Sequence, residues 1–250
     1  MKRRALLGGV LAVGSGSVGL VAAEPDPEPE PSHRLTVVVV GAHPDDPESA
    51  CGGVMARYAA LGHDVVALYL TRGEAGIPGT PADEAARIRT AEAEKACRIL
   101  GARAVFAGQI DGATEVDNAR YQELSAQLHG LSPDVVFVHW PVDSHKDHRA
   151  ASLLVYQAWL EGPRFPLFYY ECMTGIQSQD FHPTHYLDIT AVEPKKREAL
   201  FCHASQNPNG AIYEEHELME RFRGMESGTE LAEAFVRHAF GNQDGFPGLR

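Results

Sequence analysis

A short turn near the start of the chain concentrates side chains that could bind a metal ion and move protons. Residues 37–48 read VVVVGAHPDDPE, so His43, Asp45, Asp46 and Glu48 directly follow a run of four valines. The valine run predicts a strand that is buried on both faces, as in a parallel sheet. Open α/β sheets bind their ligands at the carboxyl ends of strands, which is where this turn would lie.

The spacing within the turn suggests that its side chains have divided duties. A hydrolytic metal site needs about three protein ligands and one open position for water. His43 and Asp46 can reach one ion from a single tight turn, and Asp45 would then act as general base on the water. Glu48 would support the turn or the surroundings of the metal. The alternative is that the turn only caps the next helix, through Asp46 or Ser49.

A second cluster follows another valine-rich strand, expected at 133–139, and supplies the partners that the first turn lacks. The strand leads into WPVDSHKDH, in which His148 would complete a His, Asp, His ligand set. Such a set suits zinc and also accommodates Fe(II) or another divalent ion. His145 would donate a proton or stabilise an oxyanion, while Asp143 and Asp147 would hold imidazoles in the correct tautomer. A solvated polar loop is the alternative, but two clusters at two strand ends favour a metal site.

The two clusters resemble signatures of the PIG-L/LmbE-like N-deacetylases, metal-dependent enzymes that cleave an N-acetyl or similar amide, often on an amino sugar. Residues 42–48 match the AHPDD-x-E signature and residues 145–148 match H-x-D-H, although Lys146 stands where proline is common. The resemblance runs in order from about residue 35 to residue 206. Weaker matches are residues 71–76 with T-x-G-E-x-G, Arg89 and Glu92 with R-x-x-E, and residues 203–206 with H-x-S-Q.

This resemblance implies an activity and a ligand set that agree with the chemical interpretation. His43, Asp46 and His148 would hold the metal, zinc or another divalent ion such as Fe2+, and Asp45 would be the general base. The enzyme would be a zinc-dependent N-deacetylase that removes an N-acyl group, most simply N-acetyl, from an amine such as an amino sugar or its conjugate. Its partner would be a small-molecule or glycan amide.

The resemblance also implies roles around the metal. His145, as an imidazolium, would be the electrophilic or acid partner of the reaction, with Asp147 supporting it. Substrate contacts are implied for Glu74, Arg89 and Asp111. A loop cap, a surface arginine and a turn aspartate are the plainer interpretations of these three residues.

Two other functions fit parts of the pattern. A metal-dependent hydrolase of another bond, such as a phosphoester, would prefer a second metal and basic phosphate contacts, and few Lys or Arg residues lie near the clusters. A non-catalytic metal- or sugar-binding protein on this scaffold need not keep Asp45 and His145 together, whereas this chain has both.

The elements that must position these clusters alternate between strands and helices. The alternation predicts an α/β fold, a Rossmann-like, doubly wound, mostly parallel sheet with flanking helices. Substrate choice would lie in residues 76–81, 171–183 and the tail. We expect strands at 35–40, 64–70, 104–107, 133–139, 167–171 and 186–189, helices at 51–61, 83–100, 119–130, 147–160 and 192–203, and a helical, partly charged tail at 214–240.

The first residues of the chain predict a targeting segment. Residues 1–23 combine a Lys-Arg-Arg start, a short apolar stretch rich in glycine and a small-residue end, which is typical of a signal peptide. The paired arginines favour the twin-arginine route, with the ordinary secretory route as the alternative. Residues 24–33 would be an acidic Pro-rich linker and residues 34–250 the PIG-L/LmbE-like deacetylase domain. The protein would be exported, periplasmic or extracellular.

Composition limits the partners of this protein. The formal charge of −12 becomes −15 when Lys2, Arg3 and Arg4 are removed with the leader. Nucleic acid and anionic membranes demand basic surfaces, so neither is expected as a partner, and no membrane span is expected in the mature chain. The four cysteines show no CxxC spacing, and their even number would allow disulfides. Three of them, Cys51, Cys97 and Cys202, lie among apolar residues in expected helices, which favours buried free thiols. The sequence leaves the oligomeric state open, an oligomer included.

Overall fold

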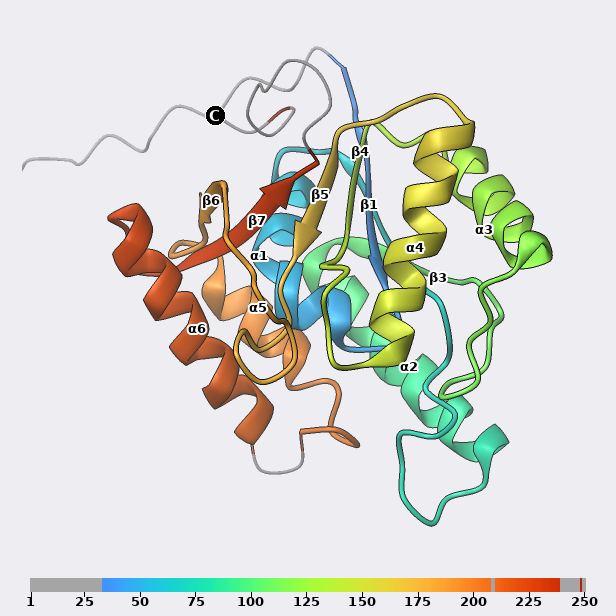
Figure 1. Ribbon diagram of the computed structural model, residues 1–250. Helices are drawn as coiled ribbons and strands as arrows, with labels where there is room; N and C mark the ends of the chain where they lie inside the picture. Colours follow the sequence, from blue (N-terminus) through green and yellow to red (C-terminus); the bar gives the residue numbers. More distant parts are fainter. Residues whose placement is uncertain (1–32, 208–209, 239–247, 249–250) are drawn as a thin grey trace, which may run out of the picture.

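The computed structural model describes residues 33–207, 210–238 and 248 (Figure 1). The predicted leader at 1–23 and the spacer up to residue 32 lie outside the described residues. One twisted sheet runs through the described part of the chain, with helices on both faces. The two main sequence motifs, residues 42–48 and 145–148, lie at the same edge of this sheet.

The sheet has the order β3-β2-β1-β4-β5-β7-β6, with the first five strands parallel and β7 antiparallel to both of its neighbours. The predicted mostly parallel α/β sheet is confirmed. Because β1 pairs with β2 on one side and β4 on the other, the strand order reverses there, and such switch points open a crevice for ligands. The strands are β1 (Thr36–Gly41), β2 (Asp64–Tyr69), β3 (Ala102–Phe106), β4 (Val135–His139), β5 (Leu167–Tyr170), β6 (His185–Asp188) and β7 (Ala232–Arg237).

The helices cover the sheet in two layers (Figure 1). Helices α3 and α4 pack together on one face, and α1, α2 and α5 pack together on the other. Helix α6 lies against β6 and β7. The helices are α1 (Asp46–Ala60), α2 (Ala82–Leu100), α3 (Asn118–Gly130), α4 (Lys146–Glu161), α5 (Glu193–Leu200) and α6 (Ala211–Ser227).

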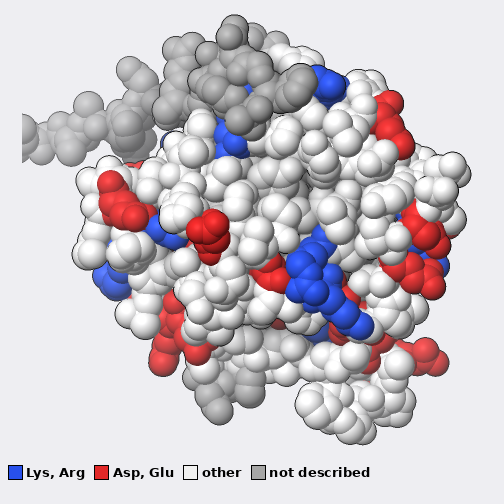
Figure 2. Space-filling model, in the orientation of Figure 1, with Lys and Arg blue, Asp and Glu red and all other residues white. Residues whose placement is uncertain are grey.

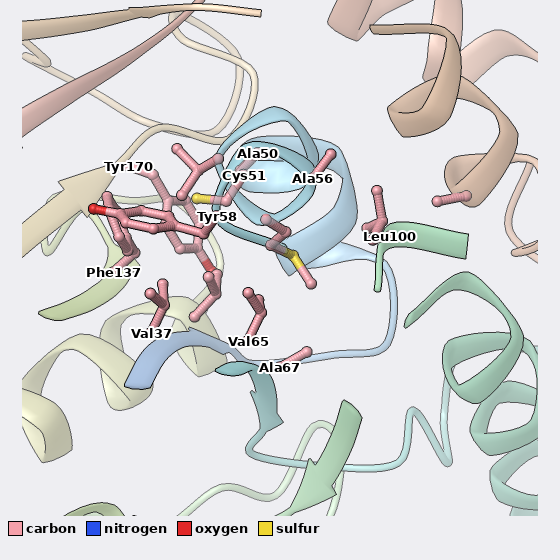
Figure 3. Close-up of a cluster of buried hydrophobic side chains, with 14 of the residues drawn as sticks. Val37, Ala50, Cys51, Ala56, Tyr58, Val65, Ala67, Leu100, Phe137 and Tyr170 are labelled. Atoms are coloured by element: carbon pink, nitrogen blue, oxygen red, sulfur yellow. The ribbon is translucent and has the colours of Figure 1, made fainter. Parts of the chain in front are cut away.

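The valine run of β1 holds both layers in place. Val37 and Val39 pack into the core under α1 and α2, part of which is shown in Figure 3, whereas Val38 and Val40 pack under α3 and α4. All four side chains are fully buried. Each contributes about 1.5–3 kcal/mol of burial free energy. The strand that ends in the first motif is therefore fixed from both faces.

Two helix starts differ from their predicted positions. Helix α1 begins at Asp46 rather than at residue 51, because Pro47 occupies its first turn, where a proline costs no hydrogen bond. Helix α2 begins at Ala82, directly after Pro81, rather than at residue 83. The predicted end of α2 at residue 100 is confirmed, and the next residue, Gly101, caps the helix with a φ of 77°.

The predicted helical tail at 214–240 is wrong in its second half. Helix α6 ends at Ser227, and Ala232–Arg237 forms β7, which inserts between β5 and β6. Charged residues such as Glu233 interrupt the apolar run that would have predicted a buried strand here. The Glu233 side chain is buried, with 4% of its surface exposed. It can be buried because it forms an ion pair with the buried Lys196, whose Nζ lies 2.7 Å from Glu233 Oε1.

Two further expectations concern cysteines and membranes. All four cysteines are buried and none forms a disulfide, as predicted. Within the described ranges, no helix is both long and apolar enough to cross a membrane.

Candidate metal centre and active site

The two motifs meet because β1 and β4 are adjacent parallel strands. The first motif runs from the end of β1 into α1, and the second runs from the end of β4 into α4. Between them lies a pocket of about 530 Å³. Its lining includes five of the six residues for which metal or catalytic roles are predicted: His43, Asp45, Asp46, His145 and His148. Asp147, the sixth, is not among the lining residues.

Asp46 lies at the centre of the cluster. Its Oδ2 is 3.3 Å from His43 Nδ1, and its Oδ1 is 3.4 Å from His148 Nε2. The backbone N–H of His43 also donates to Oδ2 at 2.7 Å, which fixes the carboxylate. All three residues are buried. The structure therefore brings the three predicted ligands together, with a donor atom of each histidine facing the carboxylate.

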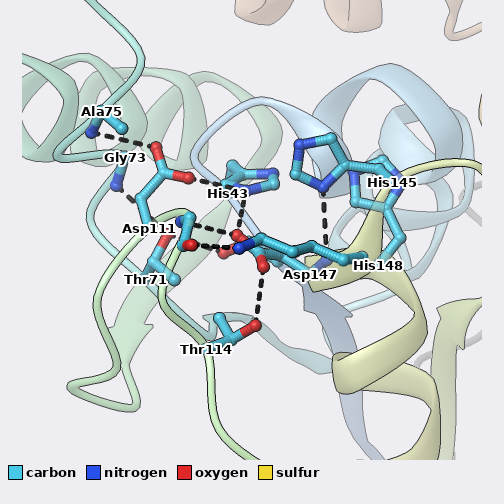
Figure 4. A network of polar contacts seen from close by, with 12 residues as sticks. His43, Thr71, Gly73, Ala75, Asp111, Thr114, His145, Asp147 and His148 are labelled. Carbon is cyan, nitrogen blue, oxygen red and sulfur yellow. Dashed lines mark hydrogen bonds and ion pairs between the residues drawn. The ribbon is translucent and has the colours of Figure 1, made fainter.

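His43 presents its other ring nitrogen to two carboxylates (Figure 4). Its Nε2 is 3.2 Å from Asp111 Oδ1 and 3.3 Å from Asp147 Oδ2. Each carboxylate is anchored by a loop, since the Ala75 N–H donates to Asp111 and the Thr114 hydroxyl donates to Asp147. A carboxylate on the far nitrogen of a metal-binding histidine fixes its tautomer and strengthens it as a ligand.

His148 has a similar arrangement on its far side. Its Nδ1 is 3.3 Å from Asp143 Oδ1. Asp143 also accepts hydrogen bonds from the His145 N–H at 2.8 Å and from the Ser178 hydroxyl at 3.1 Å. Residues 143 and 178 form an isolated antiparallel bridge, so the loop between β5 and β6 is tied to the second motif. The sequence predicts the imidazole contact of Asp143 but gives no sign of Ser178.

The charges of the cluster shift the pKa values of its members. Burial lowers the pKa of His148, but Asp46 and Asp143 outweigh burial and raise it to about 9. Burial also lowers the pKa of His43, yet its carboxylate neighbours raise it well above the ordinary value. Burial raises the pKa of Asp46, but His148 and His139 bring it well below the usual range. The cluster therefore favours bound positive charge.

Asp45 has a strained backbone beside this cluster. Its φ is 113° and its ψ is −29°, a conformation rare outside glycine that concentrates at functional sites. Its Oδ2 accepts a hydrogen bond of 3.1 Å from Arg89 Nη2, which also donates to the Pro44 carbonyl. Burial raises the pKa of Asp45, and the charge of Arg89 opposes that shift. A carboxylate with a raised pKa beside a metal site suits a general base.

Two glycines make room for Arg89, which is buried. A Cβ at Gly73 would lie 2.4 Å from Arg89 Nη1, and one at Gly76 would lie 2.2 Å from it. Both glycines belong to the loop after β2. This loop packs against the guanidinium of Arg89, which leaves no space for a side chain at either position. Arg89 lines the pocket, as expected of a substrate contact, but its hydrogen bonds go to residues 44 and 45 of the site itself.

The other two expected substrate contacts have different surroundings. Asp111 lines the pocket and contacts His43. Glu74 is not among the lining residues. Its carboxylate accepts hydrogen bonds from the backbone N–H groups of Arg72 and Asp111, at 3.2 and 3.1 Å. Glu74 therefore holds the loop that carries Asp111, which is closer to the loop-cap interpretation.

His145 faces the pocket from the N-cap of α4. Its Nδ1 accepts the Asp147 N–H at 3.3 Å, so the neutral ring carries its proton on Nε2. Burial, followed by the neighbouring His43 and His148, lowers the pKa of His145. The structure thus favours a neutral N–H donor over the expected imidazolium. Asp147 was expected to support His145, but its carboxylate contacts His43 and only its backbone contacts the His145 ring.

His139 contributes to the site without an assigned role from its sequence context. It is fully buried at the end of β4, and its ring stacks on His148 with centroids 3.9 Å apart. Its Nε2 accepts the Ala42 N–H at 3.1 Å, and burial lowers its pKa to about 4. His139 is therefore a neutral support for the His148 ring. The signal in the sequence was its alternation with Phe137, which places it on the α1 face.

Glu48 lies beneath the turn, away from the pocket. It is fully buried and accepts a hydrogen bond from the Tyr69 hydroxyl. His203 Nε2 lies 3.5 Å from the same carboxylate, and His203 is also fully buried. These contacts agree with the expected supporting role of Glu48 and place the histidine of the late H-x-S-Q match behind the site.

Part of the pocket lining comes from segments with no motif. We call these residues the outer wall. They belong to the β5–β6 loop and to the start of α6, two of the segments in which substrate choice was expected. The outer wall consists of Met173, Ile176, Gln177, Ile212, Glu215 and His216.

Comparison with known proteins supports the interpretation of the motifs. A family model described as PIG-L, GlcNAc-PI de-N-acetylase, matches residues 38–159. The diacetylchitobiose deacetylase of Thermococcus kodakarensis is 30% identical over 189 residues, which cover 69% of this chain and 70% of that protein.

Solved structures share the fold. The conserved protein TT1542 from Thermus thermophilus has a TM-score of 0.73 and 33% identity, over 86% of this chain and 99% of that one. GalB, the 4-carboxy-2-hydroxymuconate hydratase from Pseudomonas putida KT2440, has a TM-score of 0.73 at 22% identity, over 85% of this chain and 99% of that one. The second likeness shows the fold alone, so the function must be argued from the site.

Proposed function

The chain belongs to the PIG-L family, and from this premise we propose that it is a metal-dependent N-deacetylase. The substrate would be an N-acetylated amine, such as an amino sugar or its conjugate, in a small molecule or glycan. One observation carries the proposal. Asp45 and His145 both line the pocket into which His43, Asp46 and His148 converge, so a base, an N–H donor and a ligand set face the same space.

The residues fit a divalent ion, for which we propose zinc, with Fe2+ as the alternative. Two imidazole nitrogens and one carboxylate form a set that zinc accepts, and the pocket leaves an open side for water. The far nitrogen of each histidine faces a carboxylate, at 3.2–3.3 Å for His43 and 3.3 Å for His148. When bound, the ion would lower the pKa of a water and polarise the acyl oxygen.

Asp45 would act on the water. Its raised pKa, caused by burial, makes the carboxylate basic enough to take the water's proton as the oxygen attacks the acyl carbon. The hydrogen bond from Arg89 fixes one carboxylate oxygen and leaves the other for this task. Asp45 directly precedes α1 but its side chain makes no cap hydrogen bond to the helix, so it is available for this role.

His145 would stabilise the intermediate from the opposite side. Its Nε2–H can donate a hydrogen bond to the developing oxyanion without a positive charge on the ring. Collapse of the tetrahedral intermediate breaks the C–N bond, and the proton taken by Asp45 passes to the departing amine. The products are the carboxylic acid, acetate for an N-acetyl group, and a free amine.

The proposal is tested by acetate release from N-acetylglucosaminides, with the metal-loaded protein and its Asp45→Asn variant. Loss of the base should reduce turnover by about 10²- to 10⁴-fold while metal content stays near that of the wild type. Loss of metal in this variant would show that Asp45 is a ligand. Bound metal without acetate release from any amide would favour a binding protein, and phosphate release from phosphoesters alone would favour the other hydrolase class.

We propose that residues 1–23 direct export, to the periplasm or the outside of the cell. The support is the sequence pattern of that segment, which precedes the described residues. A reporter fused to residues 1–33 should be exported, and replacing Arg3 and Arg4 by lysines should block export if the twin-arginine route is used. A reporter that stays inside the cell would refute the proposal.

A further inference from the structure

The three weaker sequence matches are joined in the structure by one run of contacts. They are the loop at 71–76, the pair Arg89 and Glu92 on α2, and residues 203–206 after α5. Among the described side chains, the one that donates a hydrogen bond to the proposed base, Asp45, is Arg89. The other matched residues can therefore affect the base through what they do to Arg89.

Arg89 is the cation of this site. It is the single Lys or Arg side chain among the described residues that line the pocket. Figure 2 shows other basic side chains gathered over the start of α4, where the chain has Lys146 and Arg149. Both of these donate to backbone carbonyls, and neither lines the pocket. The placement of positive charge at Asp45 therefore depends on Arg89.

The loop after β2 helps to fix the Arg89 side chain. Arg89 Nη2 donates to the Asp45 carboxylate and to the Pro44 carbonyl. Its Nε has no hydrogen-bond partner among the described residues. The backbone of Gly73 and Gly76 packs directly against the guanidinium, so closely that a Cβ at either position would collide with it. The guanidinium thus stays on Asp45 only while this loop stays in place.

A residue from the far end of the chain holds this loop. Gln206 Nε2 donates to the Gly76 carbonyl at 2.9 Å, across 130 residues of sequence. Gly76 is one of the two glycines that cover Arg89. Gln206 also lines the pocket. Its amide is therefore placed where it can fix the loop from the pocket side.

The helix that carries Arg89 also fixes Gln206. The N–H and the hydroxyl of Ser205 both donate to the Glu92 carboxylate, at 2.9 and 2.6 Å. Hydrogen bonds to an ionised carboxylate are among the stronger ones in proteins. Gln206 Nε2 also donates to the Ser205 hydroxyl oxygen, at 3.2 Å. Because Glu92 lies three residues after Arg89, both side chains leave the same face of α2, and the contacts close a ring.

We infer that Gln206 is a positioning residue for the proposed base. It holds the Gly76 carbonyl, the loop holds the guanidinium of Arg89, and Arg89 holds the Asp45 carboxylate. This inference rests on the proposed deacetylase function for its effect on turnover. Misplacement of a reacting group by about 1 Å can cost a factor of about 100 in rate. Loss of Gln206 should therefore slow the reaction without weakening the binding of substrate.

The first test compares acetate release by the metal-loaded Gln206→Leu and Gln127→Leu proteins, with N-acetylglucosaminides as substrates. We expect kcat of Gln206→Leu to fall by about 10- to 100-fold, with KM and metal content within about twofold of the wild type. Gln127 also donates to a backbone carbonyl, that of Ala107, but it is exposed and does not line the pocket. Gln127→Leu should leave both constants unchanged. A raised KM with unchanged kcat in Gln206→Leu would make Gln206 a substrate contact and overturn the inference.

The second test asks whether Gln206 acts through Arg89. If it does, the double variant Gln206→Leu with Arg89→Gln should have a kcat within about twofold of Arg89→Gln alone. Effects that multiply in the double variant would overturn the inference. Ser205→Ala is a milder change that keeps Gln206 and removes its support. It should lower kcat by about threefold at unchanged KM, and it decides the matter if Gln206→Leu does not fold.

Hydrogen exchange tests the loop without reference to activity. The N–H groups of residues 72, 73, 75 and 76 are all hydrogen-bonded. We expect them to exchange about fivefold faster in Gln206→Leu than in Gln127→Leu, because the loop loses an anchor. Equal exchange in the two variants would overturn the inference while the deacetylase function stands. If the wild type cleaves no amide, the proposed function fails, and the role of Gln206 in turnover fails with it.

Discussion

Two groups of buried charges contact α1, and they are built differently. The group of His43, Asp46 and His148, which we call the motif group, has contacts of 3.3 and 3.4 Å, at the long end of hydrogen bonding. The second group has Lys196 Nζ at 2.7 Å from both Glu220 and Glu233. All of these residues are less than a tenth exposed.

The second group pairs its charges internally, although Glu220 Oε2 has no hydrogen-bond partner among the described residues, whereas the first group opens onto a pocket. Glu233 also accepts the N–H groups of Gly53 and Val54 on α1, at 2.7 and 2.8 Å. Lys196 therefore links α5 to α6 and β7, and Glu233 links them to the helix that follows the first motif. Burial of charge alone does not mark a functional site. A better indication is a set of donor atoms that face one another at long distances beside a pocket, as in the first group.

The comparison predicts that Lys196→Met affects stability and leaves the chemistry intact. The substitution leaves two carboxylates buried without their cation, which typically costs about 3–5 kcal/mol. Urea unfolding should show this loss, while metal content and kcat/KM per folded molecule change by less than about twofold. Lys195→Met, at an exposed position on the same helix, should change the free energy of unfolding by less than about 0.5 kcal/mol. Loss of metal from folded Lys196→Met protein would break the distinction between the two groups.

The same comparison predicts that Asp143→Asn affects metal binding more than stability, the reverse of Lys196→Met, and that its overall effect is smaller. Removal of the charge behind His148 Nδ1 should weaken metal binding by about 10- to 100-fold, because the imidazole loses the carboxylate that orients it. Stability should fall less than in Lys196→Met, since the amide oxygen can still accept from Ser178. Competition with a chelating dye measures the affinity. Asp180→Asn, on the exposed part of the neighbouring loop, is the matched control, and equal affinities in both variants would argue against the role of Asp143.

The sequence predicts the convergence of the motif group because its members are local. His43 and Asp46 lie three residues apart, His145 and His148 likewise, and each pair follows a buried valine-rich strand. Parallel pairing of the two strands then suffices to bring the pairs together.

The remaining contacts depend on packing between distant segments. Asp147 contacts His43 because the Thr114 hydroxyl, from a distant loop, holds its carboxylate in place. The spacing of residues within the motif does not predict this contact. The Lys196 group joins residues from α5, α6 and β7, and the polarity of Glu233 made its strand resemble a charged helical tail. The outer wall has no signature at all, because apolar and amide side chains in loops occur everywhere.

Arg89 connects the two kinds of group, since it is a buried charge whose Nη2 is hydrogen-bonded within the site, and its removal should change the pH dependence of the reaction. Burial raises the pKa of Asp45 and Arg89 opposes this, so Arg89→Gln should raise the Asp45 pKa further. Because the base must be deprotonated, the acid limb of the kcat/KM profile should move to higher pH, by about one unit. Arg87→Gln removes an exposed arginine from the same helix, paired with Glu84, and should leave the profile in place. A shift to lower pH in Arg89→Gln would contradict this electrostatic role. A uniform loss of activity with an unmoved profile would mean that Arg89 holds the turn by its bond to Pro44 and has no electrostatic effect on Asp45.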